Sequence, residues 1–233
     1  MSEWDKFVKQ FVTLGGYKRV LGGLLSTIEI AVFGLAIGII IGTLIGIVRV
    51  MPKYKIFPKI LDKICSVYVA FFRGTPMVVQ LLIGHFVLLP AINVNISGVA
   101  EAAVIFGLNS GAYVSEIMRA GIQSVDKGQL EAGRALGLTF WTTMQKIVVP
   151  QAVKNIIPTL GNEFISLVKE TSVVSFIAVT DVTRAFRQLG DATYAYLVPY
   201  LMLAAVYLVI VLLIAWGVKA LERRMKRSEK SGN

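Results

Sequence analysis

The sequence predicts an all-α, polytopic membrane protein with five transmembrane helices, and two observations carry this prediction. Hydrophobic residues make up 55% of the 233-residue chain and gather in several long apolar runs, which a soluble domain of this length would not carry. The net charge of +10 comes from Lys and Arg between these runs and after the last one. The positive-inside rule assigns such segments to the cytoplasm, and the sequence shows no nucleic-acid-binding motif beside them.

The N-terminal segment, residues 1–19, is predicted to be an amphipathic helix at the membrane interface. Its apolar residues fall at helical spacing with polar residues between them: Trp4, Phe7, Val8, Phe11 and Val12. The alternative is a frayed terminus, because isolated short helices are marginal.

The first predicted transmembrane helix, residues 21–48, exceeds the roughly 20 residues needed to cross a bilayer. Four glycines recur in it at every fourth position, Gly34, Gly38, Gly42 and Gly46. Such a stripe favours close contact with another helix. Glu29 lies near one end, where a structural role at the interface competes with a functional one.

A basic loop follows, with Arg49, Lys53, Lys55, Lys59 and Lys63 opposed only by Asp62. The positive-inside rule places this loop in the cytoplasm, so the first helix runs from outside to inside. The chain therefore starts outside, and five crossings leave the C-terminus in the cytoplasm.

The second predicted helix, residues 64–89, is interrupted by Arg73-Gly74-Thr75-Pro76. Irregular backbone at membrane depth is tolerated only against protein or a water-filled cavity, so this insert lines a path or its inner mouth. Gln80 and His85 lie in the same helix. His85 is the only histidine, which favours a structural role over a metal or proton site.

Three more helices are predicted at residues 98–118, 151–180 and 196–218, with outer loops at 90–97 and 181–194. The third carries Asn109 and its small polar neighbours in its middle. The fourth is the least hydrophobic. Its polar residues are expected to face the bundle interior or an aqueous end, and these include Asn162, Glu163, Ser166 and Lys169. The spacings of four and three place Asn162, Ser166 and Lys169 on one helical face. Residues 20–224 then form one permease-like membrane domain, and residues 225–233 a basic cytoplasmic tail.

The longest polar interruption, residues 126–150, is predicted to form two short helices on the cytoplasmic side. Asp126 and Gln129 fit a capping box, Gly137 suits a left-handed helix end, and Thr139 caps a second helix that stops before Pro150. From the residues alone, this knob either docks a partner or packs on itself; its apolar anchors are Leu136, Leu138, Phe140 and Trp141.

The same segment resembles the EAA loop of ATP-binding cassette (ABC) importer permeases. The resemblance lies in Glu131-Ala132-Gly133, then Gly137, then Ile147-Val148-Val149-Pro150, although relatives usually have alanine where this chain has Gly133. Further stretches resemble the polar amino-acid permeases, from about residue 21 to 224: Phe72-Arg73-Gly74-Thr75-Pro76, Leu108-Asn109-Ser110-Gly111-Ala112-Tyr113, Pro158-Thr159-Leu160-Gly161-Asn162-Glu163-Phe164 and Lys169-Glu170-Thr171-Ser172.

The resemblance implies a type I importer permease in a bacterial inner membrane, paired with a copy of itself or a close paralogue. It implies that a cytoplasmic ABC ATPase dimer docks on the loop and that an extracytoplasmic binding protein delivers the amino acid. ATP and Mg²⁺ would bind the ATPase, because this chain has no phosphate-binding loop, and no cofactor, metal or catalytic residue is expected in the chain itself. The coupling residues it implies are Glu131, Ala132, Arg134, Leu136, Gly137, Leu138 and Pro150.

The predicted substrate path consists of polar positions in the broken and central helices, together with one alanine: Ala70, Arg73, Thr75, Gln80, Asn109, Asn162, Glu163, Ser166 and Lys169. Several relatives carry glutamate at the position of Ala70, where it can pair with a basic substrate. Alanine there favours a neutral polar amino acid such as glutamine, or cystine. Two alternatives stay open: an ion-coupled transporter or channel that needs no ATPase, and a membrane enzyme with Glu163 and Lys169 as an acid–base pair.

Overall fold

The computed structural model describes residues 2–230, with side chains as far as Met225, and this part of the chain contains helices and no strand. The all-α prediction is confirmed for it. Most of the predicted basic tail, residues 226–233, has no described side chains. The elements in chain order are α1 (Glu3–Val8), η1 (Lys9–Thr13), α2 (Gly16–Val50), α3 (Ile56–Gly74), α4 (Met77–Ile83), η2 (Gly84–Leu88), α5 (Leu89–Ala91), α6 (Gly98–Gln123), α7 (Lys127–Ala135), α8 (Phe140–Thr143), η3 (Met144–Val148), α9 (Val149–Glu170), η4 (Thr171–Ile177), α10 (Val182–Asp191) and α11 (Leu197–Lys230).

The glycine stripe of α2 lies against α6, and the two helices run in the same direction. A Cβ atom placed on each glycine would come within 2.6 to 3.1 Å of a side chain on α6. The facing pairs are Gly34 with Phe106, Gly38 with Ser110, Gly42 with Val114 and Gly46 with Met118. The predicted close helix contact is confirmed.

Helix α9 runs opposite to α6 and α11, which closes the bundle. Gly121 of α6 packs on Ile156, whereas Ser110, earlier in α6, hydrogen-bonds Glu163, later in α9. The main core lies where α2, α4, α6, α9 and η4 meet. Its fully buried side chains include Ile30, Leu81, Phe106, Val168 and Val174.

The predicted interruption of the second helix is present. Thr75 and Pro76 are extended, and the two arms, 56–74 and 77–91, meet at a bend of 106°. The sharpness of this bend was not foreseen. By length and hydropathy, two described helices are able to cross a membrane, α2 and α11, or three if the bent pair counts as one. The five crossings therefore remain a prediction.

Most of the predicted outer loop, residues 181–194, forms helix α10, and its place on the outer side stays a prediction. Asp181 caps this helix, its carboxylate accepting hydrogen bonds from the backbone of Thr183 at 3.0 Å and Arg184 at 2.9 Å. Burial raises the pKa of the Asp181 carboxyl, and these hydrogen bonds oppose that rise. Apolar residues of α10 pack with Phe7 of α1 and Val20 of α2, which stabilises the helix.

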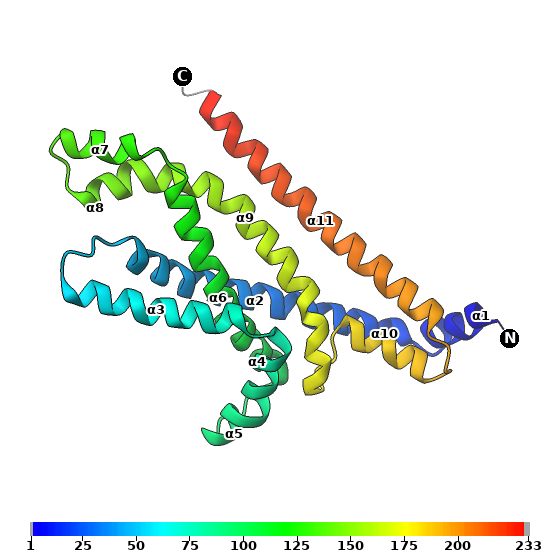
Figure 1. Cartoon of the computed structure of the whole chain (residues 1–233). Helices are drawn as coiled ribbons and strands as arrows, with labels where there is room; N and C mark the ends of the chain where they lie inside the picture. Colours follow the sequence, from blue (N-terminus) through cyan, green and yellow to red (C-terminus); the bar gives the residue numbers. More distant parts are fainter. Residues whose placement is uncertain (1, 231–233) are drawn as a thin grey trace.

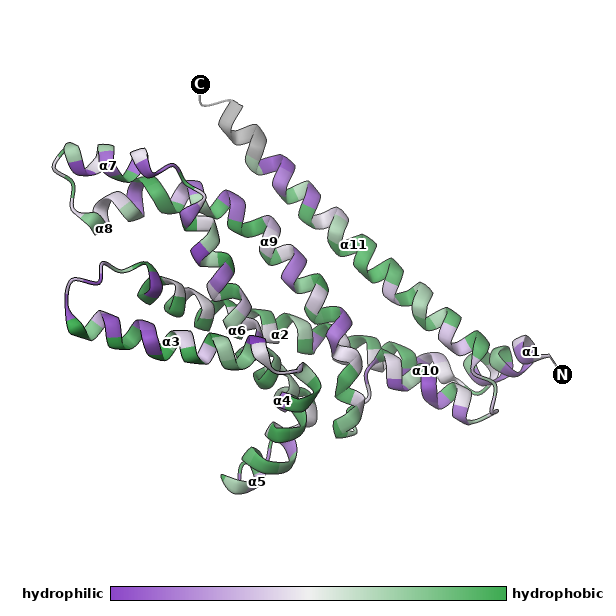
Figure 2. Cartoon of the chain, in the orientation of Figure 1, coloured by the Kyte–Doolittle hydropathy of each residue, from purple (hydrophilic) through white to green (hydrophobic). Residues whose placement is uncertain are grey.

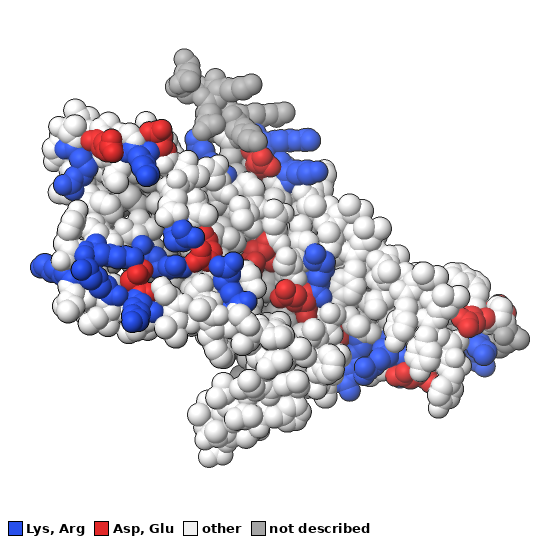
Figure 3. Space-filling view, in the orientation of Figure 1, with Lys and Arg blue, Asp and Glu red and all other residues white. Residues whose placement is uncertain are grey.

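The two ends of the molecule differ in content (Figure 1). One end holds α7, α8, the α2–α3 connection and the end of α11, while the other holds α1, α10 and the start of α11. Between these two ends, α2 and α11 consist mostly of hydrophobic residues (Figure 2). Lys and Arg gather over α3 and the α2–α3 connection, whereas over α7 they lie beside Asp and Glu (Figure 3). The positive-inside rule predicts such a basic excess for a cytoplasmic end.

Candidate functional site

A cavity of about 520 Å³ lies between α6 and α9, beside the end of α3. Four of the predicted path residues line it: Arg73, Asn162, Glu163 and Ser166. The spacing of 162 and 166 places both on one face of α9, as the sequence indicated. The other lining residues come chiefly from α6 and α9: Tyr113, Glu116, Ile117, Ala120, Gly121, Ser124, Asn155 and Thr159.

The cavity presents opposite charges from different helices. The Arg73 guanidinium lies 5.4 Å from the centre of the Tyr113 ring, and its side chain is 46% exposed. The Glu163 carboxylate accepts a hydrogen bond from Ser110 Oγ at 2.9 Å. A cavity lined by the Arg73 guanidinium and by the carboxylates of Glu116 and Glu163 suits a ligand that carries both an anionic and a cationic group.

Three predicted path residues form a hydrogen-bond network beneath the bend instead of lining this cavity. Gln80 Nε2 donates to the Phe72 and Thr75 carbonyls at 2.9 and 3.0 Å and contacts Thr75 Oγ1 at 2.8 Å. Asn109 Nδ2 donates to the Phe72 carbonyl at 3.2 Å and to Gln80 Oε1 at 2.9 Å. The network satisfies carbonyls that the bend leaves without helical partners.

Ala70 and Lys169 lie apart from the cavity lining. Both are exposed, Ala70 about one turn before Arg73 on α3 and Lys169 near the end of α9. The predicted shared face of α9 therefore holds for Asn162 and Ser166 and does not bring Lys169 into the cavity.

Glu116 on α6 was missed as a site residue. Its Oε1 accepts a hydrogen bond from Arg49 Nη1, and its Oε2 accepts from Arg119 Nη2 at 2.6 Å and Nε at 3.1 Å. Arg73 Nη1 lies 4.0 Å from the same Oε2. A carboxylate three residues before an arginine near the end of an apolar run is the signal that sequence reasoning passed over.

His85 pairs with Glu101 at the other side of the bundle. Its Nδ1 lies 2.8 Å from Glu101 Oε2, and the Glu101 side chain is 4% exposed. Among the described residues no three His, Cys, Asp or Glu side chains gather to hold a metal ion. The structural role favoured for His85 from the sequence stays a prediction.

The predicted knob, residues 126–150, comprises α7, α8 and the turn between them, followed by η3 and the first two residues of α9. Asp126 caps α7 by accepting a hydrogen bond from the backbone of Gly128 at 2.7 Å, Gly137 has a positive φ of 82°, and Thr139 caps α8. The reciprocal half of the capping box is different from the prediction, because Gln129 Oε1 accepts from Gln151 at 3.4 Å.

The predicted helix stop before Pro150 is wrong. The chain stays helical from α8 through the π-helical segment η3 into α9, and Pro150 lies in the first turn of α9. Proline is tolerated there because the first turn does not need its amide hydrogen.

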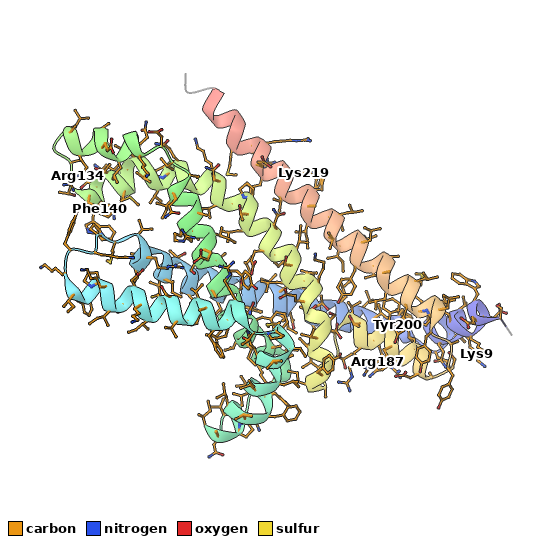
Figure 4. The ribbon with its side chains drawn as sticks, in the orientation of Figure 1. Lys9, Arg134, Phe140, Arg187, Tyr200 and Lys219 are labelled. Atoms are coloured by element: carbon orange, nitrogen blue, oxygen red, sulfur yellow. The ribbon has the colours of Figure 1, made fainter. Side chains whose placement is uncertain are left out.

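The knob is packed on one side and exposed on the other. Gly133, Thr143 and Met144 are buried between its helices, whereas Leu136 is 82% and Trp141 46% exposed. Among the other predicted coupling residues, Glu131, Ala132, Arg134, Gly137 and Pro150 are exposed and Leu138 is partly buried. Figure 4 places Arg134 and Phe140 at this end, far from Lys9 and Arg187.

The chain is similar to known transport proteins over most of its length. Residues 34–227 match the family model described as "binding-protein-dependent transport system inner membrane component". The arginine transport system permease protein ArtQ of Bacillus subtilis is 41% identical over 90% of this chain and 94% of its own. A putative glutamine transport system permease protein GlnP of Rickettsia felis is 39% identical over 88% of this chain and 92% of its own. A crystal structure of an amino acid ABC transporter with histidines matches with a TM-score of 0.82 and 37% identity, over 92% of this chain and 98% of the other.

Proposed function

Because this chain belongs to the family of binding-protein-dependent transport system inner membrane components, we propose that it is the membrane-spanning permease of an ATP-driven importer of a polar amino acid. The observation that carries the proposal is the connection between knob and cavity. The α7–α8 knob is joined at one end to α6 and at the other, through η3, to α9. These two helices provide most of the cavity lining.

The connection allows a force on the knob to reach the cavity. Asn155 of α9 donates a hydrogen bond to Ser124 Oγ at the end of α6, 2.8 Å away, so the two helices are also tied to each other beside the knob. A cytoplasmic ABC ATPase that grips the exposed face of the knob would move both cavity walls. The ATPase would supply hydrolysis, with ATP and Mg²⁺ bound to it.

The cavity supports an amino acid as the substrate. Its α-carboxylate would pair with Arg73 and its α-ammonium with Glu163, and the Asn162 amide and Ser166 hydroxyl would meet a polar side chain. Relatives are named for arginine and for glutamine. Alanine at position 70 offers no carboxylate for a basic side chain, so we favour a neutral polar amino acid such as glutamine, or cystine.

The proposed assembly follows from the two ends of the molecule. The basic end with α7 and α8 faces the cytoplasm of a bacterium and its ATPase dimer, and five crossings of the inner membrane place the N-terminus outside. An extracytoplasmic binding protein would dock at the opposite end, and a second permease half, either a copy or a close paralogue, would complete the path. An ion-coupled carrier acting alone is the alternative.

Reversing the charge of Glu131 tests the proposal. Glu131 is exposed on α7, so Glu131→Arg should leave the chain folded while reversing a charge on the face that the knob offers to the ATPase. We expect substrate-stimulated ATP hydrolysis and amino-acid uptake to fall to background in proteoliposomes that contain the permease, its ATPase and its binding protein.

The matched control is Arg187→Glu, a charge reversal at an exposed residue of α10 at the far end, for which co-purification and basal hydrolysis should stay as in the wild type. Uptake by this chain alone, driven by an ion gradient, would refute the ATP-driven importer. Full coupling in Glu131→Arg would show that the knob is not the docking site.

A further inference from the structure

The Glu116 carboxylate forms ion pairs with three arginines that come from three different parts of the chain. Arg49 ends α2, Arg73 ends α3 at the bend, and Arg119 follows Glu116 by one turn of α6. One carboxylate therefore faces three guanidinium groups, which leaves an excess of positive charge beside the cavity. The other acidic residue that lines this cavity, Glu163, is hydrogen-bonded to Ser110.

The three arginines are held unequally. Arg119 makes two hydrogen bonds to Oε2 and one to Gln123, and Arg49 is hydrogen-bonded to Oε1 and only 19% exposed. Arg73 stands 4.0 Å from Oε2, is 46% exposed and lies over the Tyr113 ring. An ion pair this long and this exposed contributes little, so Arg73 is the arginine that can exchange partners.

Resting on the function proposed above, we propose that Glu116 is a positioning residue that competes with the carboxylate of the cargo for Arg73 and thereby sets how readily the cavity releases it. Arg49 and Arg119 fix the Glu116 carboxylate at the cavity wall. When a carboxylate enters the cavity, Arg73 turns from Glu116 to the cargo; when the cargo leaves, Glu116 takes Arg73 back. The cargo class that this exchange recognises is a carboxylate-bearing solute.

Replacing Glu116 with glutamine removes the competing charge and keeps an oxygen that accepts hydrogen bonds. We expect the purified Glu116→Gln permease–ATPase complex to bind the transported amino acid about two- to fivefold more tightly, which corresponds to ~0.4–1 kcal/mol, within the range of an exposed ion pair. Maximal uptake should fall by a similar factor, because release slows. The measurement is equilibrium dialysis without binding protein, using whichever of labelled L-glutamine, L-arginine and L-cystine the wild type carries.

Two comparisons separate this role from a merely structural one. The carboxamide analogue of the same amino acid should bind wild type and Glu116→Gln equally, because it has no carboxylate for Arg73. Glu116→Asp, which keeps the charge, should restore the affinity towards the wild-type value. If Glu116 had only a structural role, Glu116→Gln would instead lower the thermal stability and weaken the binding of both ligands.

Unchanged or weaker binding in Glu116→Gln, or equal tightening for the carboxamide, would overturn this inference and leave the importer proposal intact. If the wild-type complex carried no amino acid with ATP, the proposed function would fail, and this inference with it.

Discussion

Gly133 shows how one residue sets the packing of the knob. A Cβ atom on Gly133 would lie 2.4 Å from Thr143 Cγ2 and 2.9 Å from Thr143 Oγ1. Thr143 is fully buried, and its hydroxyl donates to the Thr139 carbonyl at 3.0 Å, so it has little freedom to move. The sequence alone assigns Gly133 a cost of roughly 1 kcal/mol in helix propensity. Glycine at this position also leaves space for the Thr143 side chain. That space results from a contact between two helices, which a local sequence pattern does not show.

The residue-scale prediction is a coupling between positions 133 and 143. Gly133→Ala should destabilise the chain by about 1–3 kcal/mol despite the better helix propensity of alanine, because the added methyl meets a stiff, buried side chain. Adding Thr143→Ala removes that side chain, and the double variant should be more stable than the sum of the two single changes predicts, by about 0.5–3 kcal/mol. Thermal unfolding of all four proteins in detergent checks this, and additive effects would contradict it.

At the scale of helices, Pro76, Pro90 and Pro150 behave in two ways. Pro76 follows an extended threonine and ends α3, as the clash between proline and the preceding residue leads one to expect. Pro90 and Pro150 each lie in the first turn of a helix that follows a π-helical segment, so helical structure continues through both. Hydrophobic periodicity does not reveal a π-helical turn, which explains why the stop predicted at Pro150 was wrong while the interruption at Pro76 was right.

The prediction for this scale concerns what holds the bend open. Gln80→Leu removes the amide that bonds the Phe72 and Thr75 carbonyls; Asn109 still donates to the Phe72 carbonyl, but the Thr75 carbonyl loses its side-chain partner, which costs about 1–3 kcal/mol. The melting temperature should fall accordingly. In the control Gln151→Leu, an exposed amide that bonds the Ile147 carbonyl is lost, and the change should stay within ~0.5 kcal/mol. A Gln80→Leu protein with unchanged melting but abolished uptake would show that Gln80 contacts substrate, as the sequence suggested.

At the scale of the whole molecule, the succession and packing of the long helices were easier to predict than the residues that meet in the site. Apolar runs and basic connections give the sequence of long helices, and the glycine stripe of α2 indicates the close packing found on α6. Which polar side chains meet was only partly predictable. Arg73, Asn162, Glu163 and Ser166 share a cavity, whereas Gln80 and Asn109 turn to the backbone of the bend. That division depends on the 106° angle between the arms of the broken helix, which hydropathy does not encode.

The last prediction tests whether the knob and the cavity move as one unit. The connection from α6 to α7 is only residues 124–126, and Ser124 in it is tied to α9 through Asn155. Inserting two glycines after Val125 should leave the exposed face of the knob able to bind the ATPase, so basal ATP hydrolysis persists. Uptake should fall about 5- to 150-fold, the range of a coupling free energy of ~1–3 kcal/mol between sites.

The same insertion after Asn95, in the exposed connection before α6, lengthens the chain by the same amount without touching the knob, and uptake should stay close to wild type. The readouts are co-purification of the ATPase, basal hydrolysis and uptake in proteoliposomes. Wild-type uptake with the insertion after Val125 would mean that α6 is not driven by the knob. Because η3 runs into α9 without interruption, the remaining route for a force on the knob would then be α9 alone.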